Sequence, residues 1–127
     1  MSLIHADDAL WALLFDDADI VSEGAVDREG VELVYRGTTS IILSTRLLGR
    51  ADEDFVSRLA RVASIDPHLR LRAVRIARRE AQVRAPSALE PAHMDVVVRS
   101  VADGVRIDVE VDAVVDERAV GMHQRGR

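Results

Sequence analysis

The stretch V-R-I-D-V-E-V-D-A, residues 105–113, decides the fold class of this chain. Apolar and polar residues alternate through it without a break, so the apolar ones share one face of a strand and the charged ones share the other. The charged face carries Arg106 and then the acidic ladder, a name used here for Asp108, Glu110 and Asp112. The sequence therefore predicts a strand with one side in the core and an acidic outer side.

A hairpin is predicted just before this strand. Residues 94–101 form a second run rich in valine, and the Asp103-Gly104 pair between the two runs is typical of tight two-residue turns. A loop at Asp103-Gly104 pairs Arg99 with Asp108 across the strands, where they form an ion pair. The same pairing directs four valine side chains into the core: Val96, Val98, Val109 and Val111.

Like charges face each other further along the predicted hairpin. Counting outward along both strands from the loop at Asp103-Gly104 places Asp95 opposite Asp112, which is unfavourable unless a cation lies between them. We expect this cation to be an arginine from elsewhere in the chain or from a partner. A divalent metal ion is the alternative, but one strand face rarely supplies the six or more oxygens that calcium prefers.

Three further strands are predicted upstream as a meander. Residues 20–26 and 31–36 are short strand candidates on either side of a turn at residues 27–30. Residues 36–38, Arg-Gly-Thr, indicate a second turn. Residues 39–48 are rich in β-branched and aliphatic side chains, so they predict a third, well-buried strand.

Two helices are predicted from acidic starts and apolar spacing. Asp7-Asp8 can cap a short helix that runs through Phe15. Residues 52–54 are all acidic, which favours the beginning of a second helix, and this helix is expected to end near Ser64. Its buried face is predicted to carry four residues: Phe55, Leu59, Val62 and Ala63.

A third helix is predicted from Asp66-Pro67, because an aspartate followed by a proline is the arrangement expected at a helix N-cap and first turn. Apolar residues then recur at helical spacing: Leu69, Ala73, Ile76, Ala77 and Ala81. Residues 68–72, His-Leu-Arg-Leu-Arg, also alternate as a strand would. The sequence therefore leaves helix and strand open for residues 67–72.

These elements predict an α+β protein in which an antiparallel sheet of about five strands packs against helices, in the order α-β-β-β-α-α-β-β. Residues 1–118 are expected to form a single domain and residues 119–127 a flexible basic tail. This order is loosely similar to that of the acidic, dimeric chaperones of bacterial secretion systems, which run helix, three strands, helix, two strands. The likeness is one of topology without a shared motif, and the closing helix usual in those chaperones is missing.

The composition excludes several kinds of chemistry. The chain of 127 residues contains no cysteine, and all 17 of its basic residues are arginine. It therefore has no disulfide, thiolate zinc site, cysteine nucleophile or lysine Schiff base. Apolar stretches are too short to cross a membrane, and we expect a cytoplasmic protein. The net charge of −5 argues against a protein held mainly by nucleic-acid phosphates.

A basic segment inside this acidic chain is the main functional signal. Residues 51–84 hold eight arginines, and three of them, Arg72, Arg75 and Arg79, are candidates for an interaction surface together with the acidic ladder. We therefore expect a non-enzymatic protein-binding domain that self-associates as a homodimer and acts as an adaptor, scaffold or chaperone-like protein. Exposed sheet edges are a second reason to expect a dimer.

Two alternatives stay open. The arginines of residues 51–84 could bind nucleic acid or another anion, although aromatic residues for base stacking are scarce there. The chain could also be a small enzyme, since catalytic residues can be distant in sequence. No motif indicates a catalytic residue, a metal or a cofactor. A deep pocket that gathers several of four residues, Arg46, His68, Asp108 and Glu110, would favour the enzyme, whereas flat complementary faces would favour an interaction domain.

Overall fold

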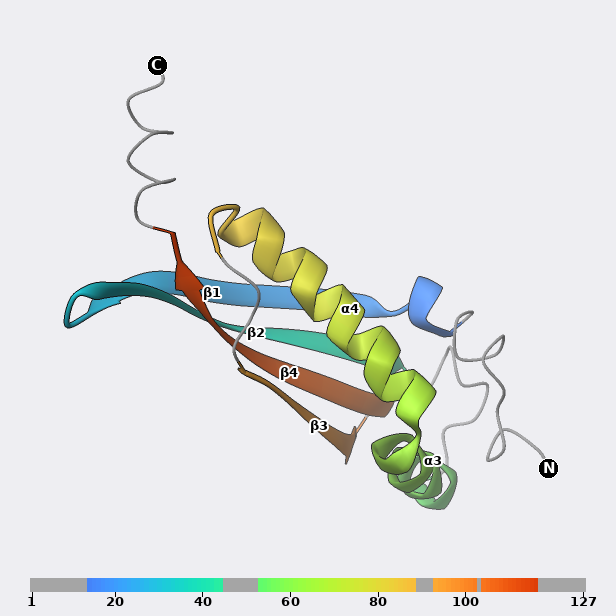
Figure 1. Ribbon diagram of the computed structural model, residues 1–127. Coiled ribbons are helices and arrows are strands. Elements are labelled where there is room, and N and C mark those ends of the chain that lie inside the picture. The colour runs from blue at the N-terminus through green and yellow to red at the C-terminus, as the bar shows by residue number, and fades with distance from the viewer. Residues whose placement is uncertain (1–13, 45–52, 89–92, 103, 117–127) are drawn as a thin grey trace.

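The computed structural model describes residues 14–44, 53–88, 93–102 and 104–116, which form one antiparallel sheet with helices against it (Figure 1). The strands are β1 (Asp19–Glu29), β2 (Glu32–Ser44), β3 (His93–Val101) and β4 (Gly104–Val115). Their order in the sheet is β1-β2-β4-β3, so two hairpins lie side by side and meet where β2 pairs with β4. The helices are α3 (Glu53–Ile65) and α4 (Pro67–Arg84), and residues 14–16 are also helical. The α+β class with an antiparallel sheet is confirmed.

The prediction of five strands is wrong, because the second and third predicted strands are one continuous strand, β2. The turn expected at residues 36–38 is absent, and Gly37 instead pairs with Gly24 inside the sheet. The side chain of Tyr35 lies over both glycines, since a Cβ atom at either would come within 2.7 Å of Tyr35 Cζ. The lack of a side chain at Gly37 therefore leaves space for a buried aromatic ring, and Gly37 does not form a turn. Two described strands, β1 and β2, therefore precede α3 and α4, where the sequence predicts three.

Both hairpin turns lie close to their predicted positions but not at them. The β1–β2 strands stay paired as far as Glu29 and Glu32, so the turn expected at residues 27–30 falls at Gly30-Val31. Gly30 has a φ of 61°, which glycine adopts without strain.

The β3–β4 hairpin is closed by Val101 and Gly104 rather than by a loop at Asp103-Gly104. Gly104 is a strand residue opposite Ser44, and a Cβ atom there would lie 2.9 Å from the carbonyl carbon of Leu43. The predicted pairing is therefore wrong by two residues. A shift of two keeps every side chain on its predicted face.

The segment that the sequence left open, residues 67–72, is helical. The Asp66 carboxylate accepts hydrogen bonds from the backbone nitrogens of His68, at 2.9 Å, and Leu69, at 3.3 Å, and thereby caps α4. Leu69 is fully buried while Leu71 is 50% exposed. In a strand these two side chains would share a face, so the difference in burial is a direct consequence of helical geometry.

The core lies between the helices and one face of the sheet. Val109 and Val111 are buried and Val96 and Val98 are partly buried, as predicted. On α3, Leu59 and Ala63 are buried as predicted, Val62 is half-buried, and the side chain of Phe55 lies outside the described residues. Most of the first predicted helix, with its cap at Asp7-Asp8, also lies outside them. Several further residues complete the core: Leu14, Phe15, Tyr35, Ile41, Leu43, Val56, Leu69, Ala73, Ala77, Val105 and Ile107.

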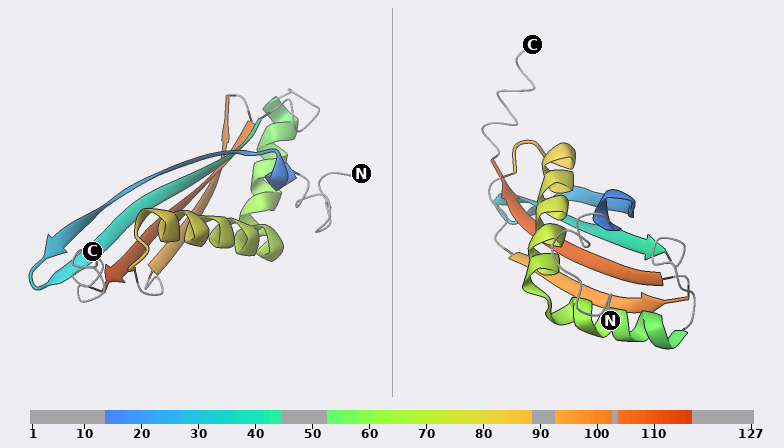
Figure 2. Two further views of the ribbon diagram at one scale, coloured as in Figure 1. Left: turned by 90° about the horizontal axis from the view of Figure 1, so that it is seen from above. Right: turned by 90° about the vertical axis from the view of Figure 1, so that its right-hand side faces the viewer.

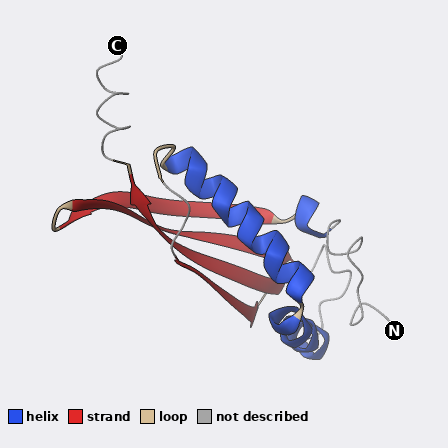
Figure 3. Cartoon of the chain, viewed as in Figure 1, coloured by secondary structure: helices blue, strands red, loops and turns tan. Residues whose placement is uncertain are grey.

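Both helices lie on the same side of the sheet, as the turned views show (Figure 2). Colouring by secondary structure makes the two layers visible, with the helices in front of the strands (Figure 3). We call the opposite side of the sheet the open face, because no described helix covers it. No described helix is both long enough and apolar enough to span a membrane.

Candidate interaction surface on the open face

The open face presents side chains in cross-strand rows, each with one residue from β1, β2, β4 and β3 in that order. The pairing of the strands defines three neighbouring rows. The arginine row is Asp19, Ile42, Arg106 and Arg99; the valine row is Val21, Ser40, Asp108 and Val97; the acidic row is Glu23, Thr38, Glu110 and Asp95. The two arginines of β3 and β4 thus lie on one side of the valine row, and the acidic row lies on its other side.

A hydrogen-bonded network occupies the centre of the valine row. The Ser40 hydroxyl donates to Asp108 Oδ1 across 2.6 Å, and Arg106 Nε donates to the same oxygen across 2.9 Å. Arg99 donates to Asp108 Oδ2 at 3.0 Å, and a second Arg106 nitrogen lies 3.1 Å from Ser40 Oγ. Asp108 is only 8% exposed although it lies on the uncovered face. Its carboxylate is therefore surrounded by donors from its own chain.

The network keeps Asp108 ionised. Burial by itself would raise the pKa of Asp108, but the hydrogen bonds from Ser40 and Arg106 and the positive charges of Arg106 and Arg99 outweigh burial and lower the pKa. Two guanidinium groups share this single carboxylate, so the network of Ser40, Asp108, Arg99 and Arg106 has a net positive charge. This arrangement confirms the predicted ion pair between Arg99 and Asp108, although the two residues face each other diagonally rather than directly.

The acidic row lacks such compensation. Asp95 and Glu110 lie directly opposite each other on β3 and β4, and Glu23 follows on β1 beyond Thr38. Within the described residues, neither Asp95 nor Glu110 forms an ion pair. The predicted contact between Asp95 and Asp112 is replaced by this like-charged pair of Asp95 and Glu110.

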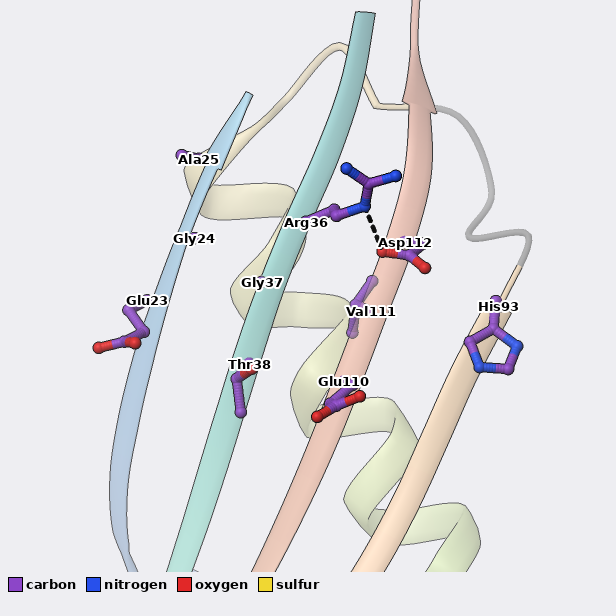
Figure 4. Close-up of a pocket in the computed structure, with 10 residues that line it drawn as sticks. All are labelled: Glu23, Gly24, Ala25, Arg36, Gly37, Thr38, His93, Glu110, Val111 and Asp112. Atoms are coloured by element: carbon purple, nitrogen blue, oxygen red, sulfur yellow. Dashed lines mark ion pairs between the residues drawn. The ribbon is translucent and has the colours of Figure 1, made fainter. Parts of the chain in front are cut away.

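A hollow of about 580 Å³ is lined by three residues of the acidic row, Glu23, Thr38 and Glu110 (Figure 4). Arg36 Nε lies 3.5 Å from Asp112 Oδ1 in this hollow, and Arg36 also pairs with Glu29. The hydrogen bond from Arg36 lowers the pKa of Glu29. Figure 4 shows Arg36 directed toward Asp112, with His93 on the far side of β4. An arginine of the same sheet therefore compensates Asp112, as expected, whereas Asp95 has no ion-pair partner in the described part of the chain.

The two predicted halves of the interaction surface face in opposite directions. The acidic ladder lies on the open face, with Asp108 and Asp112 paired to arginines and Glu110 unpaired within the described residues. Arg72, Arg75 and Arg79 lie three and four residues apart on α4, which places them on one side of that helix and on the opposite side of the sheet. Arg72 is bound to Asp16 at 3.3 Å. The two sets therefore do not meet within one chain.

Sequence reasoning missed the partners that the sheet supplies. The open face includes four residues that the sequence analysis does not place there: Ser40, Arg36, Val21 and Val97. Their places follow from strand pairing, which the sequence predicted incorrectly for β2. The structure also leaves His68, on α4, on the far side of the sheet from Asp108 and Glu110, and Arg46 lies outside the described residues. The arrangement is one of charged rows on a sheet rather than a gathered catalytic set.

Comparison with protein-family models, with characterised proteins and with solved structures finds no match for this chain. Among the described residues, no group of three or more histidine or acidic side chains is placed to hold a metal ion. Function is therefore inferred from the chemistry of the open face itself, namely its exposed valines, its compensated network and its uncompensated acidic row.

Proposed function

We propose that this chain is a self-associating, protein-binding domain of the adaptor, scaffold or chaperone-like kind, and that the open face of the sheet is its binding surface. The valine row carries this proposal. Val21 is 56% exposed and Val97 is 44% exposed, and they lie on either side of the Ser40–Asp108 pair. Covering them with another protein would remove apolar area from water, which favours association.

The network makes this surface suitable for burial. A charged group that enters an interface without partners costs several kcal/mol. Asp108 already has hydrogen bonds from Ser40, Arg106 and Arg99, so a partner can cover it without having to supply donors. The unpaired acidic row beside the network provides recognition of basic groups, because complementary charge contributes to specificity.

The open face is favoured over the sheet edge at β1. Arg84, at the end of α4, donates a hydrogen bond to the backbone carbonyl of Ser22 and a second, at 3.1 Å, to the Ser22 hydroxyl. This contact occupies a group on an edge strand that would otherwise be free to pair with another strand. β1 also carries four carboxylates and a single arginine, which discourages pairing with a second β1.

Binding is favoured over catalysis. The Ser40 hydroxyl is hydrogen-bonded to a carboxylate, which superficially resembles a nucleophile with its base. However, the pKa of Asp108 is lowered by its hydrogen bonds and neighbouring charges once burial is outweighed. A carboxylate with a lowered pKa is a weak base, so Asp108 is poorly suited to activate Ser40.

We assign the arginines on the outer side of α4 to a contact other than self-association. The acidic ladder and α4 lie on opposite sides of the sheet, so contacts between them in two copies would be head-to-tail and would not close into a two-fold dimer. When the open faces associate, Arg75 and Arg79 point outward. They are then available to the acidic surface of a different protein.

Sedimentation equilibrium of the wild type and two variants tests the proposal. Val97→Arg places a charge in the valine row, whereas Val83→Arg makes the same change at an exposed position of α4. The wild type and V83R are expected to form dimers at high micromolar concentration, and V97R is expected to be monomeric. A monomeric wild type, or a V97R variant that associates as the wild type does, would contradict the proposal.

A further inference from the structure

We infer that the open face binds a second copy of itself about a two-fold axis, and that Arg99 and Arg106 of one copy contact Asp95 and Glu110 of the other. This inference rests on the proposed self-association and adds the orientation of the partner. It follows from the order of the three rows, because the arginine row and the acidic row lie on opposite sides of the valine row.

The spacing of the rows is what makes the face self-complementary. Residues on one face of a strand follow each other at every second position, or about 7 Å, so each charged row lies roughly that far from the valine row. Consider a two-fold axis that lies between the two sheets and runs along the valine row, across the strands. This axis places the arginine row of one copy over the acidic row of the other, and each strand over the same strand of the second copy. Arg99 of β3 then faces the second copy's Asp95, and Arg106 of β4 faces its Glu110.

This arrangement gives the charged residues of β3 and β4 in the arginine and acidic rows partners of opposite sign. Arg99 and Arg106 share only Asp108 within their own chain, and Arg99 retains an exposed guanidinium group. Asp95 and Glu110 have no ion-pair partner in the described part of their chain and lie opposite each other. The second copy supplies each charged pair with the opposite charge, and the symmetry does so twice. Val97 meets Val97 at the axis. Asp108 meets Asp108 there too, and each of these carboxylates keeps the hydrogen bonds from Ser40, Arg99 and Arg106 of its own chain.

Other orientations of two open faces are less favourable. An axis parallel to the strands would place the arginine row over the arginine row and the acidic row over the acidic row, so like charges would meet. The proposed axis does bring Asp19 of β1 toward Glu23 of the second copy. Both carboxylates are exposed on the edge strand β1, where water and salt screen their repulsion.

A charge exchange between Asp95 and Arg99 tests the orientation. In the Asp95→Arg variant, Arg99 faces an arginine of the second copy, and in the Arg99→Glu variant, Asp95 faces a glutamate of the second copy. Each single variant is therefore expected to weaken self-association roughly tenfold or more. An equimolar mixture of the two, and the double variant D95R/R99E, bring opposite charges together again. Both are expected to associate as the wild type does.

Each variant keeps a partner within its own chain, so the fold is expected to persist. Residue 95 lies opposite Glu110, and residue 99 lies opposite Arg106. Circular dichroism melting checks this, and Arg75→Glu on the outer side of α4 is the matched charge-reversal control, expected to associate normally.

The outcomes separate the two proposals. If D95R and R99E both associate as the wild type does while V97R is monomeric, the open face is the interface but the inferred orientation is wrong. The orientation is also overturned if neither the mixture nor the double variant regains association. A monomeric wild type instead overturns the proposed self-association, and the orientation with it.

Discussion

Ser40 on β2 donates its hydroxyl proton to Asp108 on β4 across 2.6 Å, and both residues are buried on a sheet face that no described helix covers. Arg106 contacts both of them, at 3.1 Å from Ser40 Oγ and 2.9 Å from Asp108 Oδ1. The pair links the two hairpins at the junction of β2 with β4. It therefore stabilises the sheet, and it also satisfies the hydrogen bonds of the polar groups at the centre of the proposed interface.

Replacing Asp108 with asparagine is expected to destabilise the protein by about 1–3 kcal/mol, because hydrogen bonds to a charged group are lost and two arginines lose their shared carboxylate. The pKa of Asp108 is lowered in the folded protein, so its charge stabilises the fold above the unfolded value of about 3.9. This contribution is lost as the pH falls from there through the folded pKa. Urea denaturation of wild type and D108N at several pH values measures it.

Glu32→Gln is the matched control for this measurement, since Glu32 is exposed at the beginning of β2, outside the three rows, and has no ion-pair partner among the described residues. Its stability is expected to stay within about 0.5 kcal/mol of the wild type at neutral pH. A difference between wild type and D108N that does not shrink on acidification would show that the Asp108 charge is not stabilising.

A methyl group added at Gly24 is expected to cost about 1–3 kcal/mol, because its Cβ atom would meet the buried ring of Tyr35. The hydroxyl oxygen of Tyr35 is the nearest atom to that Cβ. G24A is therefore expected to cost less in a Tyr35→Phe background. Thermal melting of the four proteins in this double-mutant cycle gives the coupling, and additive effects would exclude the contact.

Gly30→Asn serves as the control for the Gly24 change. Gly30 has nothing within 4 Å of an added Cβ, and asparagine tolerates its left-handed conformation better than other residues. We expect G30N to melt close to the wild type. A loss as large as that of G24A would indicate a general sensitivity of the β1–β2 hairpin rather than a clash with Tyr35.

Two leucines of α4 separate its helical conformation from the alternative strand. Leu69→Ala is expected to cost about 2–5 kcal/mol, because Leu69 is fully buried against the sheet. Leu71→Ala is expected to cost less than about 1 kcal/mol, because half of that side chain is exposed. Denaturation midpoints of the two variants check the difference, and equal losses would contradict the helix.

Binding of nucleic acid is expected to be weaker than roughly micromolar near physiological salt, which is the range of ordinary non-specific binding. The net charge of −5 opposes phosphate contacts, and Phe15 and Tyr35 are buried and cannot stack with bases. Fluorescence anisotropy with duplex and single-stranded DNA measures the affinity. Tighter binding that disappears in R75Q/R79Q would assign the outer side of α4 to nucleic acid instead.

Local patterns in the sequence determined those elements that depend on neighbouring residues. The alternation of residues 105–113 predicts which side of β4 is buried, because successive side chains of a strand point to opposite faces. Asp66-Pro67 predicts the beginning of α4, because the cap is formed within three residues. The charged outer side of β4 could be predicted for the same reason.

Only the tertiary structure decided the features that depend on distant groups. Gly37 belongs to a strand because the ring of Tyr35 requires the space, and the β3–β4 turn is displaced because Gly104 packs against the backbone of Leu43. Ser40 and Asp108 are 68 residues apart and meet because β2 pairs with β4. A sequence pattern of period two predicts the face of a residue but not its neighbour on the next strand, since that neighbour depends on register.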